Sequence, residues 1–192
     1  MTTQVRKTVA DLQRIADGRK AELVDGEVQL MAPTGRKSGY AGDAVLVSLW
    51  NYARQGNAGQ AVGDNKGFVV NLPHRQSFSP DAAFYTGGGA ANSMDFFEGA
   101  PVFAVEVRSK WDYGATAEGK MATKRADYFA AGTRVVWDVD LQSPDVVRVY
   151  RADAPDQPMI YRRGEMAEAE PAVPGWTMPV DDLFPQSGGD QP

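Results

Sequence analysis

The feature that most constrains the fold is the segment Val102–Val107, in which every residue is apolar except Glu106. A strand that is apolar at nearly every position is typical of the centre of a sheet with both faces covered. Such a sheet needs helices on its two sides, and hydrophobic periodicity predicts long helices at residues 38–54 and 115–131. We therefore expect an α/β (mixed α+β) protein with a central mixed sheet flanked by helices.

Two acidic residues in apolar, strand-like runs carry the chemical signal. Glu106 lies inside the central strand, and Asp81 follows Ser79-Pro80 at the start of another apolar run. A charge in such a position is costly unless it is compensated. Two carboxylates about 4 Å apart repel by roughly 4 kcal/mol at an effective dielectric near 20. A bound divalent cation would turn that penalty into affinity, which indicates metal-assisted hydrolysis.

Simpler interpretations of the two acids stay open at this point. Pro80-Asp81 could only open a turn, and Glu106 could form a buried ion pair with an arginine. On the metal interpretation, the carboxylates of Asp81 and Glu106 and the carbonyl of Val107 are the ligands. Oxygen-only ligation favours Mg²⁺, for which Mn²⁺ substitutes. The chain has no cysteine and one histidine, His74, which argues against zinc.

The helix predicted at residues 115–131 carries a candidate catalytic amine. Lys120 and Lys124 lie four residues apart and so share one face. A solvated lysine face is the simpler interpretation, and we favour it for Lys120. Lys124 precedes Tyr128 by one turn, and a packed tyrosine would fix its direction. A lysine aimed at the two acids could orient a water or stabilise developing negative charge.

Composition bounds the class of protein. The 192 residues, 43% of them hydrophobic, fit one domain over residues 1–184, with a disordered tail at 185–192. No apolar run is long enough to span a membrane, and the N-terminus lacks a signal-peptide core, so we expect a cytoplasmic protein without membrane contacts. The net charge is −5, but residues 1–150 are balanced, with 17 basic and 17 acidic side chains. A locally basic groove is therefore compatible with the acidic total.

The rest of the chain predicts alternating helices and strands. A short helix is expected at residues 8–16, and two alternating runs around Asp25-Gly26 predict a hairpin over 21–31. Residues 86–100, rich in glycine and alanine, read as a surface loop, and prolines after residue 151 indicate short edge segments. Further strands are expected at 60–63, 67–72, 77–85, 135–140 and 146–151.

Five segments occur in an order that closely resembles a known family. They are 22–27 (ELVDGE), 79–84 (SPDAAF), 105–109 (VEVRS), 124–132 (KRADYFAAG) and 135–140 (VVWDVD). This arrangement resembles the Uma2 family, also called DUF820, a branch of the PD-(D/E)XK nuclease superfamily. The resemblance covers roughly residues 8–184. It implies a restriction-endonuclease-like fold, with a four-stranded mixed central sheet, flanking helices and extra N-terminal antiparallel strands.

The resemblance also implies roles for individual residues. The first acid of the motif falls on Asp81 and the second on Glu106. Arg108 stands where the motif has its lysine, and it cannot act as a base; it could bind phosphate or point away. In this branch Lys124 would supply the missing amine. Glu22 matches an early acid that often faces the site, although a surface charge on a hairpin is an equal alternative.

The function expected from the resemblance is Mg²⁺-dependent endonuclease cleavage of DNA phosphodiester bonds, catalysed by Asp81, Glu106 and Lys124, with Glu22, Arg108 and Lys120 as accessory residues. RNA as the substrate stays open. The alternative is an inactive nucleic-acid-binding or regulatory module that keeps the nuclease fold, which Arg108 and the acidic C-terminus favour. A homodimer would suit double-strand cutting, because it would carry two sites.

Overall fold

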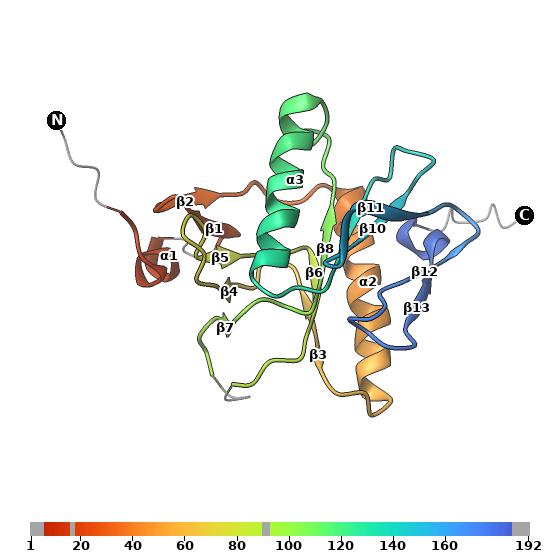
Figure 1. Ribbon diagram of the computed structural model, residues 1–192, viewed down its shortest axis with the longest axis horizontal. Helices are drawn as coiled ribbons and strands as arrows, with labels where there is room; N and C mark the ends of the chain where they lie inside the picture. Colours follow the sequence, from red (N-terminus) through yellow and green to blue (C-terminus); the bar gives the residue numbers. More distant parts are fainter. Residues whose placement is uncertain (1–5, 16–17, 90–92, 186–192) are drawn as a thin grey trace, which may run out of the picture.

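A six-stranded sheet forms the centre of the protein in the computed structural model, which describes residues 6–15, 18–89 and 93–185 (Figure 1). The strand order is β11-β10-β9-β8-β6-β3. The bounds of these strands are β3 Gln60–Gly63, β6 Ala82–Tyr85, β8 Phe103–Val107, β9 Val135–Val139, β10 Val147–Arg151 and β11 Ala154–Tyr161.

The sheet is mixed, as the sequence predicted. Strands β8 and β9 pair in parallel, with Glu106 opposite Asp138, whereas the other neighbouring strands of this sheet pair antiparallel. Two parallel neighbours need a crossover connection. Helix α3 (Ala115–Ala130) supplies it and ends before Gly132, whose φ of 105° favours glycine. The resemblance implied four strands, and the described residues extend the sheet to six.

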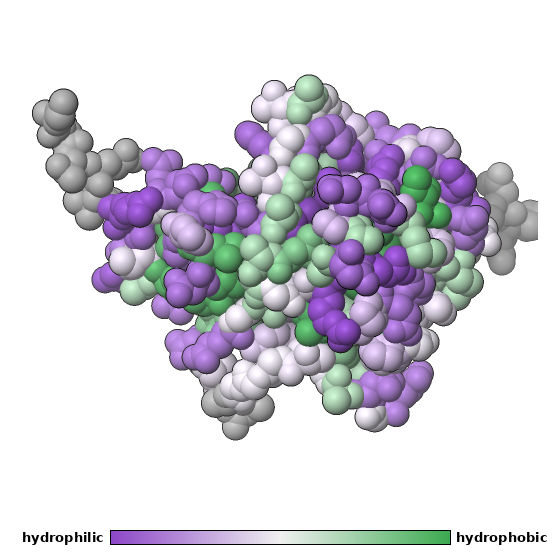
Figure 2. All heavy atoms as spheres, in the orientation of Figure 1, coloured by the Kyte–Doolittle hydropathy of each residue, from purple (hydrophilic) through white to green (hydrophobic). Residues whose placement is uncertain are grey.

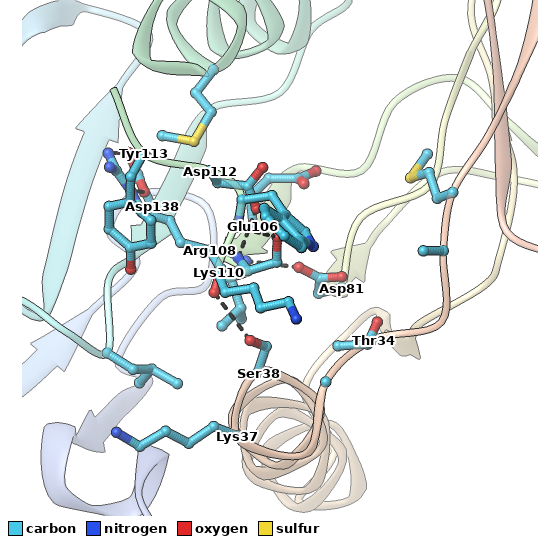
Figure 3. Close-up of a pocket in the computed structure, with 18 of the residues that line it drawn as sticks. Thr34, Lys37, Ser38, Asp81, Glu106, Arg108, Lys110, Asp112, Tyr113 and Asp138 are labelled. Carbon is cyan, nitrogen blue, oxygen red and sulfur yellow. Dashed lines mark hydrogen bonds and ion pairs between the residues drawn. The ribbon is translucent and has the colours of Figure 1, made fainter. Parts of the chain in front are cut away.

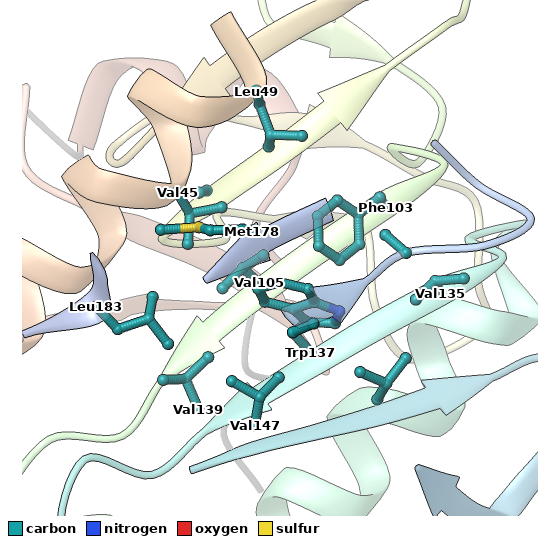
Figure 4. Close-up of a cluster of buried hydrophobic side chains, with 14 of the residues drawn as sticks. Val45, Leu49, Phe103, Val105, Val135, Trp137, Val139, Val147, Met178 and Leu183 are labelled. Atoms are coloured by element: carbon teal, nitrogen blue, oxygen red, sulfur yellow. The ribbon is translucent and has the colours of Figure 1, made fainter. Parts of the chain in front are cut away.

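Alternating side chains of the central strands fill two separate cores. Phe103, Val105 and Val107 belong to the core on the side of helix α2 (Arg36–Arg54). Figure 4 shows Phe103 and Val105 there with Val45, Leu49 and Trp137. Ala104 of β8 and Val136 of β9 point to the opposite face, where Tyr128 of α3 packs. Both faces of the sheet are therefore covered, which explains why residues 102–107 are almost uniformly apolar.

A hairpin and two small sheets surround the central sheet among the described residues. The hairpin joins β1 (Ala21–Val24) to β2 (Glu27–Leu30) through Asp25 and Gly26, which both have positive φ, 54° and 76°. This geometry confirms the predicted two-residue turn. The remaining elements are α1 Val9–Ile15, β4 Phe68–Val69, β5 Ser77–Phe78, β7 Phe97–Glu98, β12 Met166–Glu168, β13 Thr177–Pro179 and the 3₁₀ helix Val180–Leu183.

The segment predicted as one strand at 77–85 is two strands in different sheets. Strand β5 pairs with β4, whereas β6 joins the central sheet. The break falls at Ser79-Pro80, because proline has no N–H for a ladder and the Ser79 N–H donates to the Glu22 carboxylate instead (2.9 Å). Beyond residue 151 the prediction was too short, since β11 runs for eight residues as an edge strand, where its two prolines are tolerated.

Two predicted segments, the loop at 86–100 and the C-terminal tail, lie partly outside the residues that the structure describes. The loop at 86–100 contains the short strand β7, and residues 90–92 of it lie outside the described residues, as do residues 186–192 of the predicted tail.

Across the described ranges, no helix combines the length and apolarity that crossing a membrane would require. In Figure 2, hydrophilic side chains gather toward the two sides of the face drawn, and side chains of intermediate to apolar character lie across its middle.

Replacing the central indole tests the packing of this core. Trp137 is fully buried and packs against Phe103 and Trp176 with ring centroids 5.3 and 5.2 Å away. We expect Trp137→Ala to lower the free energy of unfolding by about 3–5 kcal/mol in urea titrations, because it leaves a cavity. Trp50→Ala, on the half-exposed outer face of α2, should stay within about 0.5 kcal/mol of the wild type. Equal losses in the two variants would contradict this assignment of the core.

Candidate active site

Asp81 lies one residue before β6, and two hydrogen bonds tie it to β8. Its backbone N–H donates to the Val105 carbonyl (3.0 Å), and its Oδ2 accepts from the Val107 N–H (2.7 Å). The N–H and C=O of one strand residue point to the same side, so the Val107 carbonyl also faces the Asp81 side of β8. Antiparallel pairing therefore brings a carboxylate and a carbonyl oxygen to the same end of two strands.

Glu106 points from β8 toward α3. Its Oε1 accepts a hydrogen bond from the Tyr128 hydroxyl (2.7 Å) and pairs with Lys124 Nζ (2.9 Å). The partner of this strand acid is therefore a lysine, not an arginine. The Glu106 side chain is 27% exposed, and it reaches the cleft. Burial raises the pKa of Glu106; Lys124 opposes this shift, and the negative charge of Asp81 adds to it.

Lys124 bridges two carboxylates. Its Nζ lies 2.9 Å from Glu106 Oε1 and 2.9 Å from Glu22 Oε1. Burial alone would lower the pKa of Lys124, but the two carboxylates outweigh burial and raise it above the ordinary lysine value. Lys124 is therefore a fixed cation at neutral pH, and Tyr128, one turn later, holds the same Glu106 oxygen.

Glu22 is buried, so the alternative of a surface charge on the hairpin is wrong. It accepts from the Ser79 N–H and pairs with Arg75 (2.6 Å) as well as with Lys124. Burial would raise the pKa of Glu22, but these two cations outweigh it and lower the pKa. A chain of polar contacts then continues from Arg75 to Asp127 and from Asp127 to His74, each at 2.7 Å.

Lys20 is a second amine at the site that the sequence analysis missed. Its Nζ lies 2.6 Å from Asp81 Oδ1 and 2.7 Å from Asp64 Oδ1. Burial would lower its pKa, but the charges of Asp81 and Glu106 outweigh burial and raise it. One signal could have found Lys20, because it precedes Glu22 by two residues and period-2 alternation places both on one face of the strand.

Arg108 does not offer its guanidinium to the two acids. It forms two hydrogen bonds with Asp138, from Nε at 2.7 Å and from Nη2 at 2.9 Å, and it also pairs with Glu118 of α3. Arg125 binds the same Asp138 at 3.2 Å. All three guanidinium nitrogens of the buried Arg108 are thereby engaged. The residue at the motif's lysine position is part of a structural ion-pair network that ties α3 to β9.

Asp81 and Glu106 line a cleft of about 840 Å³ (Figure 3). One rim is formed by the connection from β2 to α2 and the first residues of α2, residues 31–38, and the other by the loop from β8 to α3, residues 108–113. Eight lysines and arginines line the cleft against four aspartates and glutamates, although the whole chain is negative. Lys120 is exposed on this wall, without an ion pair to any described residue. The lining thus favours an anionic ligand.

The donor atoms suit a hard divalent cation. No group of three or more histidine, aspartate or glutamate side chains in the described part of the chain is arranged as a metal cage. Mg²⁺ does not require one, because it usually binds one or two carboxylates and keeps several waters or substrate oxygens. Asp81, Glu106 and the Val107 carbonyl offer oxygen atoms of the kind that such a cation prefers. Lys20 and Lys124 pair with Asp81 and Glu106 and place positive charge beside the acids.

Comparison with protein families agrees with this geometry. The family Uma2, described as "Putative restriction endonuclease", matches residues 9–181, which is most of the chain. The chain belongs to the Uma2 family. Within it, the sequence motifs around Asp81, Glu106 and Lys124 fall on strands β6 and β8 and on helix α3.

A solved structure shares the fold of this Uma2 chain. It is the crystal structure of "a putative nuclease belonging to DUF820" from Anabaena variabilis, with a TM-score of 0.70 and 16% sequence identity. The match covers 92% of this chain and 97% of that one, and it confirms the restriction-endonuclease-like fold. No curated protein matches the chain.

The structural role of Arg108 can be tested by removing its charge. We expect Arg108→Met to lower the free energy of unfolding by about 3 kcal/mol or more, because Asp138 and Glu118 lose a cation in a largely buried network. Urea titration measures the loss. Arg134→Met, at an exposed position, is the matched control and should change stability by less than about 0.5 kcal/mol. Wild-type stability in Arg108→Met would show that the network does not hold α3 on the sheet.

Proposed function

We propose that this Uma2 protein is a metal-dependent endonuclease that hydrolyses DNA phosphodiester bonds. The observation that carries the proposal is the convergence of Asp81 and Glu106 on one cleft, with the Lys124 ammonium 2.9 Å from Glu106. Two carboxylates beside a fixed cation, in a cleft whose charged lining residues are mostly basic, match the needs of phosphodiester hydrolysis.

Asp81, Glu106 and the Val107 carbonyl would hold Mg²⁺ or Mn²⁺. A bound metal of this kind polarises the scissile phosphate and lowers the pKa of a water that it binds. The hydrogen bond from the Val107 N–H fixes the Asp81 carboxylate in direction, and the Tyr128 hydroxyl does the same for Glu106. Both acids are therefore oriented by the protein before any ligand enters.

Lys124 acts as a cation rather than as a base. Its raised pKa keeps it protonated, so it can donate hydrogen bonds to a water or to a phosphate oxygen that gains charge. Glu22 holds Lys124 from the far side, and Arg75 in turn holds Glu22. The amine beside Glu106 thus comes from helix α3, since Arg108, at the motif's lysine position, binds Asp138 instead.

Lys20 provides a second positive charge at the first acid. Asp64 holds its ammonium at 2.7 Å independently of Asp81. Lys20 can therefore stay beside the cleft when Asp81 turns to another partner, and there it would bind a phosphate oxygen. Lys20 and Lys124 then flank the two acids.

DNA is the expected substrate. RNA stays the open alternative, because basic side chains bind phosphates and do not distinguish deoxyribose from ribose. A homodimer would give two sites for double-strand cutting and is testable by sedimentation. The cytoplasmic location also stays a prediction.

A second candidate function is an inactive nucleic-acid-binding or regulatory module. The specific observation that favours it is Arg108, which occupies the motif's lysine position and is buried in a network with Asp138. On this view Lys124 would only neutralise Glu22 and Glu106, and the cleft would bind nucleic acid without turnover.

Loss of the first acid should separate the two functions. We expect Asp81→Asn, which keeps the shape of the side chain, to abolish Mg²⁺-dependent nicking of supercoiled plasmid DNA, because the negative charge that holds the metal is lost. Asp43→Asn, on the exposed face of α2, should nick at the wild-type rate. Unchanged nicking in Asp81→Asn would remove Asp81 from the mechanism.

Metal binding can be measured without turnover. Calorimetric titration of the wild-type protein with Mn²⁺ should give saturable binding in the millimolar range or tighter, and Asp81→Asn combined with Glu106→Gln should bind at least tenfold more weakly. Asp43→Asn again serves as the control. A wild-type protein that binds no Mn²⁺ at millimolar concentration would favour the inactive module.

A further inference from the structure

Trp111 is the most exposed of the chain's four tryptophans. It lies in the loop between β8 and α3, where 77% of its surface is accessible, and it lines the rim of the cleft that holds Asp81 and Glu106. Trp137 and Trp176 are buried in the core. A large aromatic side chain left in water at the mouth of a cleft has surface available for a ligand.

The loop presents this indole from a fixed turn. The Ser109 N–H donates to Asp112 Oδ2 (2.7 Å), and the Trp111 N–H donates to Ser109 Oγ (3.3 Å). After the turn, the Tyr113 hydroxyl donates to Asp140 (2.8 Å) and anchors the loop to the end of β9. The backbone that carries Trp111 is therefore held on both sides, so a ligand would not need to order it.

The surroundings of the indole are basic. Lys110 Nζ lies 4.6 Å from the centre of the Trp111 ring, in a cation–π contact. Lys110, Lys120 and Arg36 are exposed on the cleft wall, and none forms an ion pair with another described residue. An aromatic face beside unpaired cations is the combination that binds single-stranded nucleic acid, since bases stack on the ring and phosphates meet the cations.

We propose that Trp111 stacks on an unpaired nucleobase of the substrate, close to the scissile phosphate. The inference rests on the proposed function, because it takes Asp81 and Glu106 as the position of that phosphate. Trp111 lies five positions after Glu106, and five extended residues span at most about 18 Å, so one short nucleic-acid strand reaches both. The substrate class is then single-stranded DNA, or duplex DNA with an unpaired base at the cleavage site.

Charge argues for a nucleobase over an apolar protein segment as the occupant. An apolar protein segment that covered the indole would leave the ammonium groups of Lys110 and Lys120 on the cleft wall desolvated and unpaired, which is costly. A nucleotide can bind both the indole and the lysines, because its base covers the ring while its phosphate contacts Lys110 or Lys120.

Binding to short oligonucleotides in EDTA tests the proposal without turnover. We expect a single-stranded 12-mer to quench the tryptophan fluorescence of the wild-type protein. Trp111→Ala should bind it about 5- to 150-fold more weakly. Trp111→Phe should keep most of the affinity, because it keeps an aromatic face. Trp50→Ala, which removes the other exposed tryptophan from outside the cleft, should bind as the wild type does.

A series of 12-mers with one abasic site, moved along the strand, identifies the stacked base. At one position the wild-type affinity should fall to the level of Trp111→Ala, and Trp111→Ala itself should be insensitive to that abasic site. Equal affinities of wild type and Trp111→Ala, or no binding by the wild type, would overturn the proposal. Failure of the proposed function is separate: it would show as Trp111-dependent binding without Mg²⁺-dependent cleavage.

Discussion

The Lys124 ammonium between the carboxylates of Glu22 and Glu106 is the interaction on which the site depends. Its two contacts of 2.9 Å join the N-terminal hairpin, the central strand β8 and helix α3. An isolated acid in either position would be strongly disfavoured, because burial penalises its charge. The lysine makes both acids tolerable. Burial raises the pKa of Glu106 and Lys124 opposes that shift, while the side chain stays 27% exposed toward the cleft, where its carboxylate is available to a ligand.

Arg108 holds the strand and the helix that carry Glu106 and Lys124. In the position that the family motif gives to lysine, this chain has a guanidinium that binds Asp138 through two hydrogen bonds. That pairing fixes β8, β9 and α3 relative to one another. The helix so held aims Lys124 at Glu106, and the structural role of one cation therefore supports the proposed catalytic role of the other.

Much of the fold follows from local sequence patterns. Alternation predicted the hairpin around Asp25-Gly26, and the apolar run at 102–107 predicted the buried strand, because burial on both faces leaves no polar positions. The sequence could not show the break at Ser79-Pro80, since it depends on Glu22, 57 residues away, taking the Ser79 N–H. The length of strand β11 was underestimated, because its two prolines indicated short segments, although an edge strand accepts them.

A candidate site residue could be predicted where a charged side chain interrupts an apolar run. It could not be predicted where only folding brings the residue to the site. Glu106 was conspicuous for this reason. Lys20 looked like one of many charged residues before the hairpin, and only folding brings it 2.6 Å from Asp81. Arg75 and Asp127, which support Glu22 from behind, lie on segments that meet only in three dimensions.

The most direct test of the proposed centre is a crystal structure of the protein soaked in Mn²⁺, measured at a wavelength where manganese scatters anomalously. We expect an anomalous peak bound by Asp81, Glu106 and the Val107 carbonyl, with Lys124 still in contact with Glu106 and Lys20 displaced from Asp81. A map without a peak at these residues, in which Lys20 keeps its ion pair with Asp81, would contradict the proposed metal site.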